Sequence, residues 1–216
     1  MREALDAVRP RLRGWLHAGT FPVVVVAGGV LVVLSPTPQA RLSSAVYAVT
    51  AALLFGVSAL YHRGTWGPRA HSVLKRLDHA NIFLIIAGTY TPFTLLLLDP
   101  GSARTLLTFV WGGALAGVAF RVLWVGASRW LYTPVYLALG WVAVFWLPEF
   151  LAGGGPGVVT TIAVGGALYT LGGIVYAVRR PNPSVRWFGF HEVFHALTVL
   201  AFAAHCTGLA VAVTSG

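Results

Sequence analysis

The sequence predicts an all-α integral membrane protein, a seven-transmembrane helix bundle with a cytoplasmic amino terminus and a carboxyl terminus outside. Three observations lead to this fold class. The 216 residues are 57% hydrophobic and only 10% charged, and the mean hydropathy is +0.77, whereas soluble domains are about a quarter charged and under half apolar. The apolar residues fall into seven windows of about 20 residues. The Lys and Arg residues gather beside alternate ends of these windows.

Each window has the length that one helix needs to cross a hydrocarbon core roughly 30 Å thick. The expected spans are approximately residues 15–34, 43–62, 79–98, 104–125, 131–150, 157–178 and 190–213. Connectors with breaker residues separate them, at Pro36 and Pro38, Gly67 and Pro68, Pro100 and Gly101, residues 153–157, and Pro181 and Pro183. We therefore expect residues 1–216 to form a single membrane domain, and the protein to be a multi-pass protein of the cell membrane.

The positions of the basic residues predict the orientation. Thirteen of the fifteen Lys and Arg residues fall on one side: in the amino-terminal segment, after span two, around the end of span four, or after span six. Only Arg41 and Arg104 fall on the other side. Because Lys and Arg accumulate in cytoplasmic loops, the amino terminus is expected inside. The net charge of +9 then indicates attraction to anionic lipid headgroups at the cytoplasmic face, and no nucleic-acid partner is expected.

The first window has a second interpretation, as a cleaved signal peptide, because a basic segment precedes an apolar stretch. The residues that follow it, Ser35 to Ala40, contain no A-x-A cleavage site. We therefore expect the first window to remain as a membrane span.

Charged residues inside a span are costly and usually functional, and this sequence has almost none at mid-bilayer. Asp99 and Glu149 are expected at the outer ends of spans three and five. Arg121 is expected to extend its side chain from span four toward the inner interface. This distribution argues against an ion pump with a buried carboxylate relay.

Histidines and carboxylates from three distant spans are the exception, because topology places them at one depth near the cytoplasmic face. They are His62 at the end of span two, Asp78 and His79 at the start of span three, and His191, Glu192 and His195 at the start of span seven. His191 and His195 are four residues apart, so they lie on one helical face roughly 6 Å apart. These two histidines can therefore bind a single ion.

Together with His62 they provide three imidazoles, the ligand set of a catalytic Zn²⁺ ion whose fourth position holds water. Zinc lowers the pKa of such a water to about 7 and so produces hydroxide at neutral pH. Asp78 is our first choice for the group that accepts the proton. Ser58, one turn before His62, is a candidate for holding the substrate or the water.

The remaining histidines have simpler interpretations. His17 and His71 are expected to be hydrogen-bonded neighbours of lipid headgroups. His205 lies roughly 20 Å deeper along span seven than His191, and an interhelical hydrogen bond is its expected role.

Residues 191–195 also spell H-E-x-x-H, a pattern in which the Glu is the general base of soluble zinc proteases. Glu192 could instead pair with Arg186 or Arg76. The residues alone leave Asp78 and Glu192 both open as the base, and the family resemblance given next is the reason to rank Asp78 first; Glu192 and His79 are secondary candidates for the site.

Four segments at these positions resemble the progestin and adipoQ receptor family, specifically its bacterial branch, hemolysin III. They are Ser58-Ala-Leu-Tyr-His62, Leu77-Asp78-His79-Ala-Asn-Ile-Phe, Ala87-Gly88-Thr89-Tyr90-Thr91-Pro92-Phe93 and Gly189-Phe190-His191-Glu192-Val193-Phe194-His195. Their order, their placement on spans two, three and seven, and the seven-span layout of the whole chain agree with that family.

The resemblance implies a Zn²⁺ site near the inner face, held by the histidines that map to His62, His191 and His195. It also implies that the aspartate at Asp78 contacts the water on the metal and that the serine at Ser58 belongs to the site. Related membrane hydrolases include alkaline ceramidases, so the implied activity is zinc-dependent cleavage of an acyl bond, with an amide favoured, in a membrane lipid.

Two other functions stay open at this point. One is a non-catalytic seven-span receptor or signalling protein with a structural zinc, although the exposed segments are too short to favour a receptor for a protein hormone. The other is a pore-forming cytolysin, which the name hemolysin suggests. No polar stripe follows the spans to line an aqueous path, so the sequence supports a pore poorly.

Overall fold

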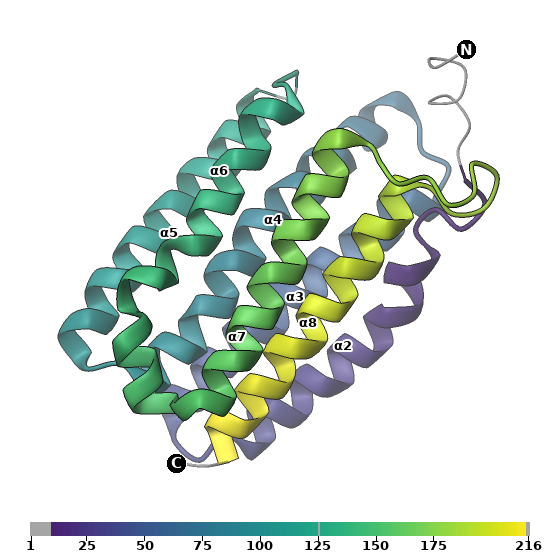
Figure 1. Ribbon diagram of the computed structural model, residues 1–216. Helices are drawn as coiled ribbons and strands as arrows, with labels where there is room; N and C mark the ends of the chain where they lie inside the picture. The colour runs from purple at the N-terminus through teal and green to yellow at the C-terminus, as the bar shows by residue number, and fades with distance from the viewer. Residues whose placement is uncertain (1–9, 125, 215–216) are drawn as a thin grey trace.

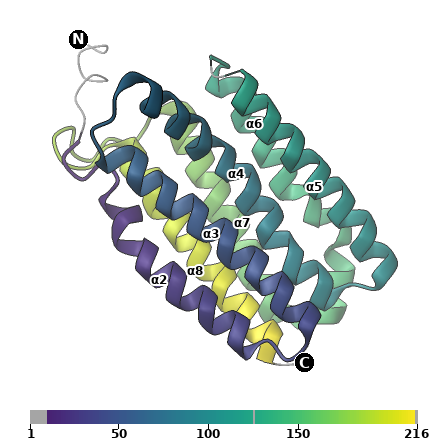
Figure 2. The same cartoon turned by 180° about the vertical axis from the view of Figure 1, so that it is seen from behind.

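The computed structural model describes residues 10–124 and 126–214, which form a bundle of long helices (Figures 1 and 2). The helices are α2 (Trp15–Leu34), α3 (Pro38–Arg63), α4 (Pro68–Leu97), α5 (Pro100–Leu123), α6 (Arg129–Trp141), the short 3-10 helix η1 (Val142–Trp146), α7 (Leu147–Val178) and α8 (Phe190–Thr214). Among the described residues the only β pairing is one bridge between Ser184 and Phe188. The predicted all-α class is confirmed.

The distribution of polar and apolar side chains identifies lipid as the solvent of this bundle. Six helical segments of the described chain are long and apolar enough to cross a membrane. Large apolar side chains cover the outside, with Leu123 84%, Phe145 79% and Val33 77% exposed, whereas Ser44 and Thr94 are fully buried. In water such a surface would be unstable, but lipid solvates it well. The protein is a multi-pass membrane protein.

The helices flank a central group (Figures 1 and 2). Helices α3, α4, α7 and α8 lie in the middle, with α2 on one side and α5 and α6 on the other. Helix α8 packs against both α2 and α7, although α2 and α8 are the first and last helices described. This arrangement brings the end of α3 and the start of α8 to the same end of the bundle, where the candidate site lies.

Prolines that the sequence placed in connectors in fact begin three helices. Pro38, Pro68 and Pro100 are the first residues of α3, α4 and α5, a position where the missing N–H of proline costs nothing. Asp99 caps α5, because its Oδ1 accepts hydrogen bonds from the N–H groups of Ser102 at 3.2 Å and Gly101 at 2.9 Å. These bonds hold the pKa of Asp99 below its usual value, and the bond from Ser102 has the largest effect.

Helices α6 and α7 belong to one 50-residue helical segment that folds back on itself. Arg129 Nε donates to the carbonyl of Ala177 at 2.8 Å, although a straight helix would separate these residues by roughly 70 Å. The reversal occurs at Gly155, whose φ of 67° and ψ of 175° are accessible to almost no other residue. We predicted a connector over residues 153–157, but only Gly155 departs from helical geometry, because glycine can make this turn alone.

Glycines allow two pairs of helices to approach closely. A Cβ atom on Gly88 of α4 would lie 1.9 Å from Thr50 Oγ1 of α3, and one on Gly165 of α7 would lie 2.2 Å from His205 Nε2 of α8. The second approach places His205 Nε2 3.2 Å from the carbonyl oxygen of Ile162. This is the interhelical hydrogen bond expected for His205. Small residues serve close packing in lipid in the same way.

Candidate metal centre

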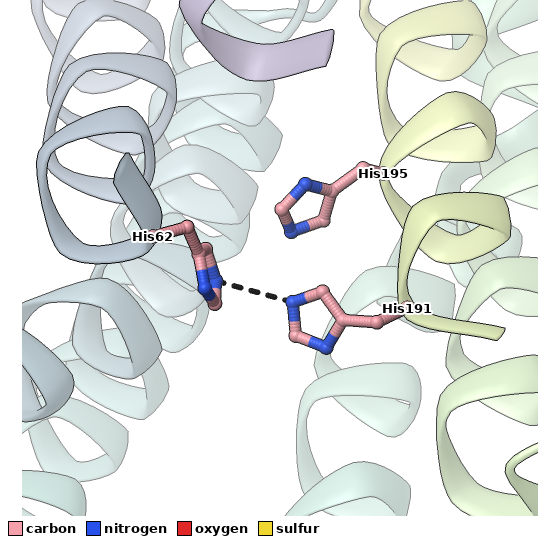
Figure 3. Close-up of side chains that lie close together, drawn as sticks. All are labelled: His62, His191 and His195. Carbon is pink, nitrogen blue, oxygen red and sulfur yellow. Dashed lines mark hydrogen bonds between the residues drawn. The ribbon is translucent and has the colours of Figure 1, made fainter. Parts of the chain in front are cut away.

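Three histidines from two helices meet at one end of the bundle (Figure 3). His62 lies in the last turn of α3, and His191 and His195 lie one turn apart at the start of α8. One ring nitrogen from each lies within 4.8 Å of the other two. His62 and His195 are buried, and His191 is partly buried. The three rings are therefore close enough to bind one metal ion.

The rings of His62 and His191 point toward each other, and their Nε2 atoms are 3.1 Å apart (Figure 3). The ring of His195 completes the cluster, with its centroid 4.5 Å from that of His191 and 5.2 Å from that of His62. The cluster joins residues 129 positions apart in the sequence. It forms because α3 ends, and α8 begins, at the same end of the bundle.

Asp78 and Ser58 lie beside the cluster. Asp78 Oδ2 is 3.8 Å from His62 Nε2, and the Asp78 side chain is 14% exposed. Ser58 is buried on α3 and is close enough to Asp78 for their side chains to share a hydrogen bond. Helix α4 begins at Pro68, so Asp78 projects from well inside a helix instead of from its first residues. The structure thus brings the five main predicted site residues into one neighbourhood.

Glu192 is engaged elsewhere. It is fully buried, one of its oxygens pairs with Nε of Arg13, and the other accepts a hydrogen bond from the N–H of Gly189 at 2.8 Å. The second bond caps the start of α8, where an acidic side chain is favoured. Both oxygens therefore hold the end of the helix, and neither belongs to the histidine cluster.

The partners suggested for Glu192 from the sequence, Arg186 and Arg76, were wrong. The segment before α2 packs along the connector before α8, with a backbone hydrogen bond of 3.0 Å from Arg11 to Arg186. That pairing brings Arg13, and not Arg186, to the buried carboxylate. Nothing in the sequence around Glu192 indicates that residues some 180 positions earlier lie beside it.

His79 turns away from the cluster and toward α5 and α7. Its Nδ1 is 3.2 Å from Arg121 Nη2, and its Nε2 is 3.4 Å from the hydroxyl of Tyr176. Arg121 itself was expected to reach toward the interface, but it is only 2% exposed. Its guanidinium lies 4.2 Å from the centre of the Tyr132 ring, because the start of α6 covers the end of α5 and encloses the side chain.

The expectation that His17 is a hydrogen-bonded neighbour of lipid headgroups was wrong. Instead of facing headgroups, it is 2% exposed, and its ring stacks on that of His195 with centroids 3.7 Å apart and planes 6° apart. His17 therefore packs against the face of the His195 ring and helps to hold that ring in place. The signal that could have found it is its depth, because the predicted topology places it near the same face as His62. His71, by contrast, is exposed.

A cavity of about 140 Å³ leads from the cluster into the bundle. Asp78, His191 and His195 line one end of it, and Phe93 and Phe150 line the other. Asp78 and Phe93 are both on α4, so the cavity extends about 22 Å along the helix axis. Its walls between these ends are mainly apolar side chains of α4, α6 and α7. The cavity therefore has a polar end and a long apolar body.

Comparisons with known proteins agree with these features. The family described as Haemolysin-III related matches residues 5–206. The "Hemolysin-3 homolog" of Bacillus subtilis (strain 168) is 36% identical over 152 residues, which cover 68% of this chain and 70% of that protein. "Hemolysin-3" of Bacillus cereus is 36% identical over 143 residues, 65% of this chain and 64% of that protein. The family match covers nearly the whole chain and confirms the resemblance seen in the sequence: this protein belongs to the haemolysin-III related family, the hemolysin III branch of the progestin and adipoQ receptor family.

Proposed function

We propose that the protein is a zinc-dependent integral membrane hydrolase that cleaves an acyl bond, with an amide favoured, in a membrane lipid. The observation that carries the proposal is the position of three histidines and an aspartate at the polar end of a long apolar cavity. Such a cavity suits an acyl chain that enters from the bilayer. A bond near the polar end of that chain would then lie beside the histidines.

The donor set fits a Zn²⁺ ion. Imidazole nitrogens bind zinc at about 2.0–2.1 Å, so two ligands of a tetrahedral site lie about 3.3 Å apart. The Nε2 atoms of His62 and His191 are 3.1 Å apart, close to that separation. Two ring nitrogens face each other at this distance while a third imidazole lies beside them. Three imidazoles and one open position are the set used in hydrolytic zinc sites.

In the proposed reaction His62, His191 and His195 would hold the ion, which when bound would act as a Lewis acid and acidify a water molecule. Asp78 accepts the proton of the attacking water and passes it to the leaving nitrogen, so that the C–N bond breaks as a C–O bond forms. A fatty acid and an amine result. Ser58 holds the Asp78 carboxylate toward the cluster, and the apolar cavity walls orient the acyl chain.

We also propose seven membrane crossings, with the histidine cluster at the cytoplasmic end. Support comes from the fold-back at Gly155, which lets α6 and α7 each cross once, and from the thirteen basic residues expected on one side. Labelling with a membrane-impermeant maleimide tests this in a Cys206→Ser background. Ser184→Cys, near the cluster, should be protected in intact cells, and Gly101→Cys, at the opposite end, should be labelled.

The first test of the enzyme is the zinc content of the purified protein. Wild type should hold about one zinc per chain and His191→Ala very little. His71→Ala is the matched control, because His71 is exposed and outside the cluster, and it should retain zinc. Hydrolysis of N-acyl and ester-linked lipids in mixed micelles should follow the zinc content. Wild type that is purified without chelators and holds no transition metal would remove the proposal.

The variant His62→Ala distinguishes a catalytic zinc from a structural zinc in a non-catalytic receptor. Under the proposal this variant loses hydrolysis and metal but keeps its helical circular dichroism and a cooperative thermal transition. A structural zinc instead predicts that the variant fails to fold. Leakage from lipid vesicles at equal rates with and without zinc would favour the pore-forming alternative that the name of the relatives suggests.

A further inference from the structure

A second cavity, of about 480 Å³, opens beside the cluster, and its charge is one-sided. We call it the basic pocket, defined by Lys75, His79, Arg121, Arg129, Tyr132 and Arg179. It lies where the ends of α5 and α7 meet the start of α6. Four Lys and Arg side chains line it, and no carboxylate of the described residues does. A cleft lined by charges of one sign concentrates ions of the opposite sign.

Arg121 is the buried member of this set. It is 2% exposed, and it contacts two rings, that of His79 through Nη2 and that of Tyr132 through the face of the guanidinium. Its Nε and Nη1 atoms are buried and make no hydrogen bond to any described residue. A buried charge without a partner is strongly destabilising. Two hydrogen-bond donor atoms of the permanently charged Arg121 guanidinium therefore lack an acceptor among the described residues.

The carboxylates of the described residues do not supply that acceptor. Asp99 and Glu149 lie at the opposite end of the bundle, at the starts of α5 and α7. Glu192 is paired with Arg13, and Asp78 lies beside Ser58 and His62. No ion pair of Arg121 occurs within residues 10–124 and 126–214. The missing acceptor is therefore to be sought in a ligand.

The basic pocket and the apolar cavity meet at three shared residues, His79, Tyr176 and His191. The Tyr176 hydroxyl is 3.2 Å from that of Tyr132 and 3.4 Å from His79 Nε2, so this layer is polar. One molecule can thus place an apolar chain in the cavity and a charged group in the pocket, with its middle beside His191. An amphiphile with an anionic head has this shape.

We infer that the basic pocket is a phosphate-binding site, with Arg121 as its buried anchor and Lys75 and Arg129 at its walls. Guanidinium groups are suited to phosphate because they donate several hydrogen bonds and stay charged. Basic pockets between membrane helices bind lipid headgroups in this manner. The site does not depend on the hydrolase. Together with the proposed function, on which this extension rests, it specifies a phosphate-bearing lipid as the substrate class.

Thermal unfolding of the purified full chain in phosphate-free neutral detergent tests the site. The probes are dioctanoyl phosphatidic acid, inorganic phosphate and dioctanoylglycerol, which has the chains without the phosphate. Phosphatidic acid should raise the Tm of wild type, and its Kd should increase at least tenfold in Arg121→Gln. The matched control is Arg104→Gln, on the same helix but exposed at the far end, which should bind like wild type.

The comparison of probes identifies the source of the phosphate. A phosphatidic acid that binds much more tightly than inorganic phosphate points to a lipid headgroup, whereas similar affinities point to free phosphate, and either result supports the site. Equal affinities of wild type and Arg121→Gln, or equal binding of dioctanoylglycerol and phosphatidic acid, would overturn it. If Arg121→Gln does not fold, Lys75→Gln takes its place, and an unchanged affinity there overturns the site.

His195→Ala separates this inference from the proposed enzyme. His195 belongs to the histidine cluster but not to the basic pocket. This variant should lose zinc and hydrolysis while binding phosphatidic acid as wild type does. Loss of phosphate binding together with the metal would show that the anion sits on the metal ion, and would refute the pocket while leaving the enzyme intact.

Discussion

The two ends of the bundle are built in different ways. At the end with the histidine cluster, buried polar groups contact partners that are far away in sequence, as His62 contacts His191 and Glu192 contacts Arg13. At the opposite end, the chain turns by local means. Asp99 caps the helix that follows it, and Gly155 reverses the chain through its own backbone conformation.

This difference indicates where function resides. Local turns need only a suitable residue at each position, and they connect the helices without bringing reactive side chains together. Charged side chains buried in a membrane are costly, and Arg121 and Glu192 are buried at the end that carries the cluster, the mouth of the cavity and the basic pocket. Substitutions at the two ends should therefore separate activity from stability.

The largest effect is expected for Asp78→Asn. The amide keeps the shape of the side chain but cannot accept a proton, so hydrolysis should fall by about 10²–10⁴-fold while zinc stays near one per chain. Asp99→Asn, the equivalent change at the opposite end, should leave the rate unaltered. Turnover and zinc content are measured on the same preparations, and normal turnover in Asp78→Asn would remove its assigned role.

A large loss of stability is expected for Glu192→Gln. The carboxylate is fully buried and holds both Arg13 and the first turn of α8, and breaking a buried pair costs about 3 kcal/mol. Chemical unfolding of Glu192→Gln, Arg13→Gln and the double variant checks this. The double variant should lose less than the sum of the single losses, and strict additivity would show that the two side chains are not coupled.

A smaller loss, about 2 kcal/mol, is expected for Gly155→Ala, because alanine is strained at the positive φ of this turn. Gly157→Ala is its control. Gly157 is helical and a Cβ atom there meets nothing within 4 Å, so stability should stay level or rise slightly. Both variants should keep wild-type zinc content. Loss of zinc in Gly155→Ala would contradict the separation of the two ends.

The smallest effect concerns pH at the opposite end. The cap bonds hold the pKa of Asp99 below that of an unfolded aspartate, which is about 3.9. The stabilisation is therefore complete above that value and is lost as pH falls through the lowered pKa. In Asp99→Asn the cap remains but does not titrate, so the Tm advantage of wild type over this variant should shrink as pH falls below about 4. A constant Tm difference between pH 3 and pH 6 would contradict this.

Sequence alone determined the features that depend on composition and short spacing. Apolar windows showed a helical membrane protein, because a lipid-exposed backbone must satisfy its own hydrogen bonds. The four-residue spacing of His191 and His195 placed them on one face of α8, and the quoted motifs indicated the family that the comparisons confirm. The interhelical bond of His205 also followed, because a polar side chain deep in lipid needs a partner.

Only the tertiary structure decided which side chains enclose one another. His17 and Arg121 looked like interfacial residues, yet one stacks on His195 and the other is buried between α5 and α6. The partner of Glu192 was Arg13, set by the packing of two distant connectors. The reason is physical: periodicity reveals the depth and face of a residue on its own helix, whereas rotation and contact between helices depend on how all of them pack.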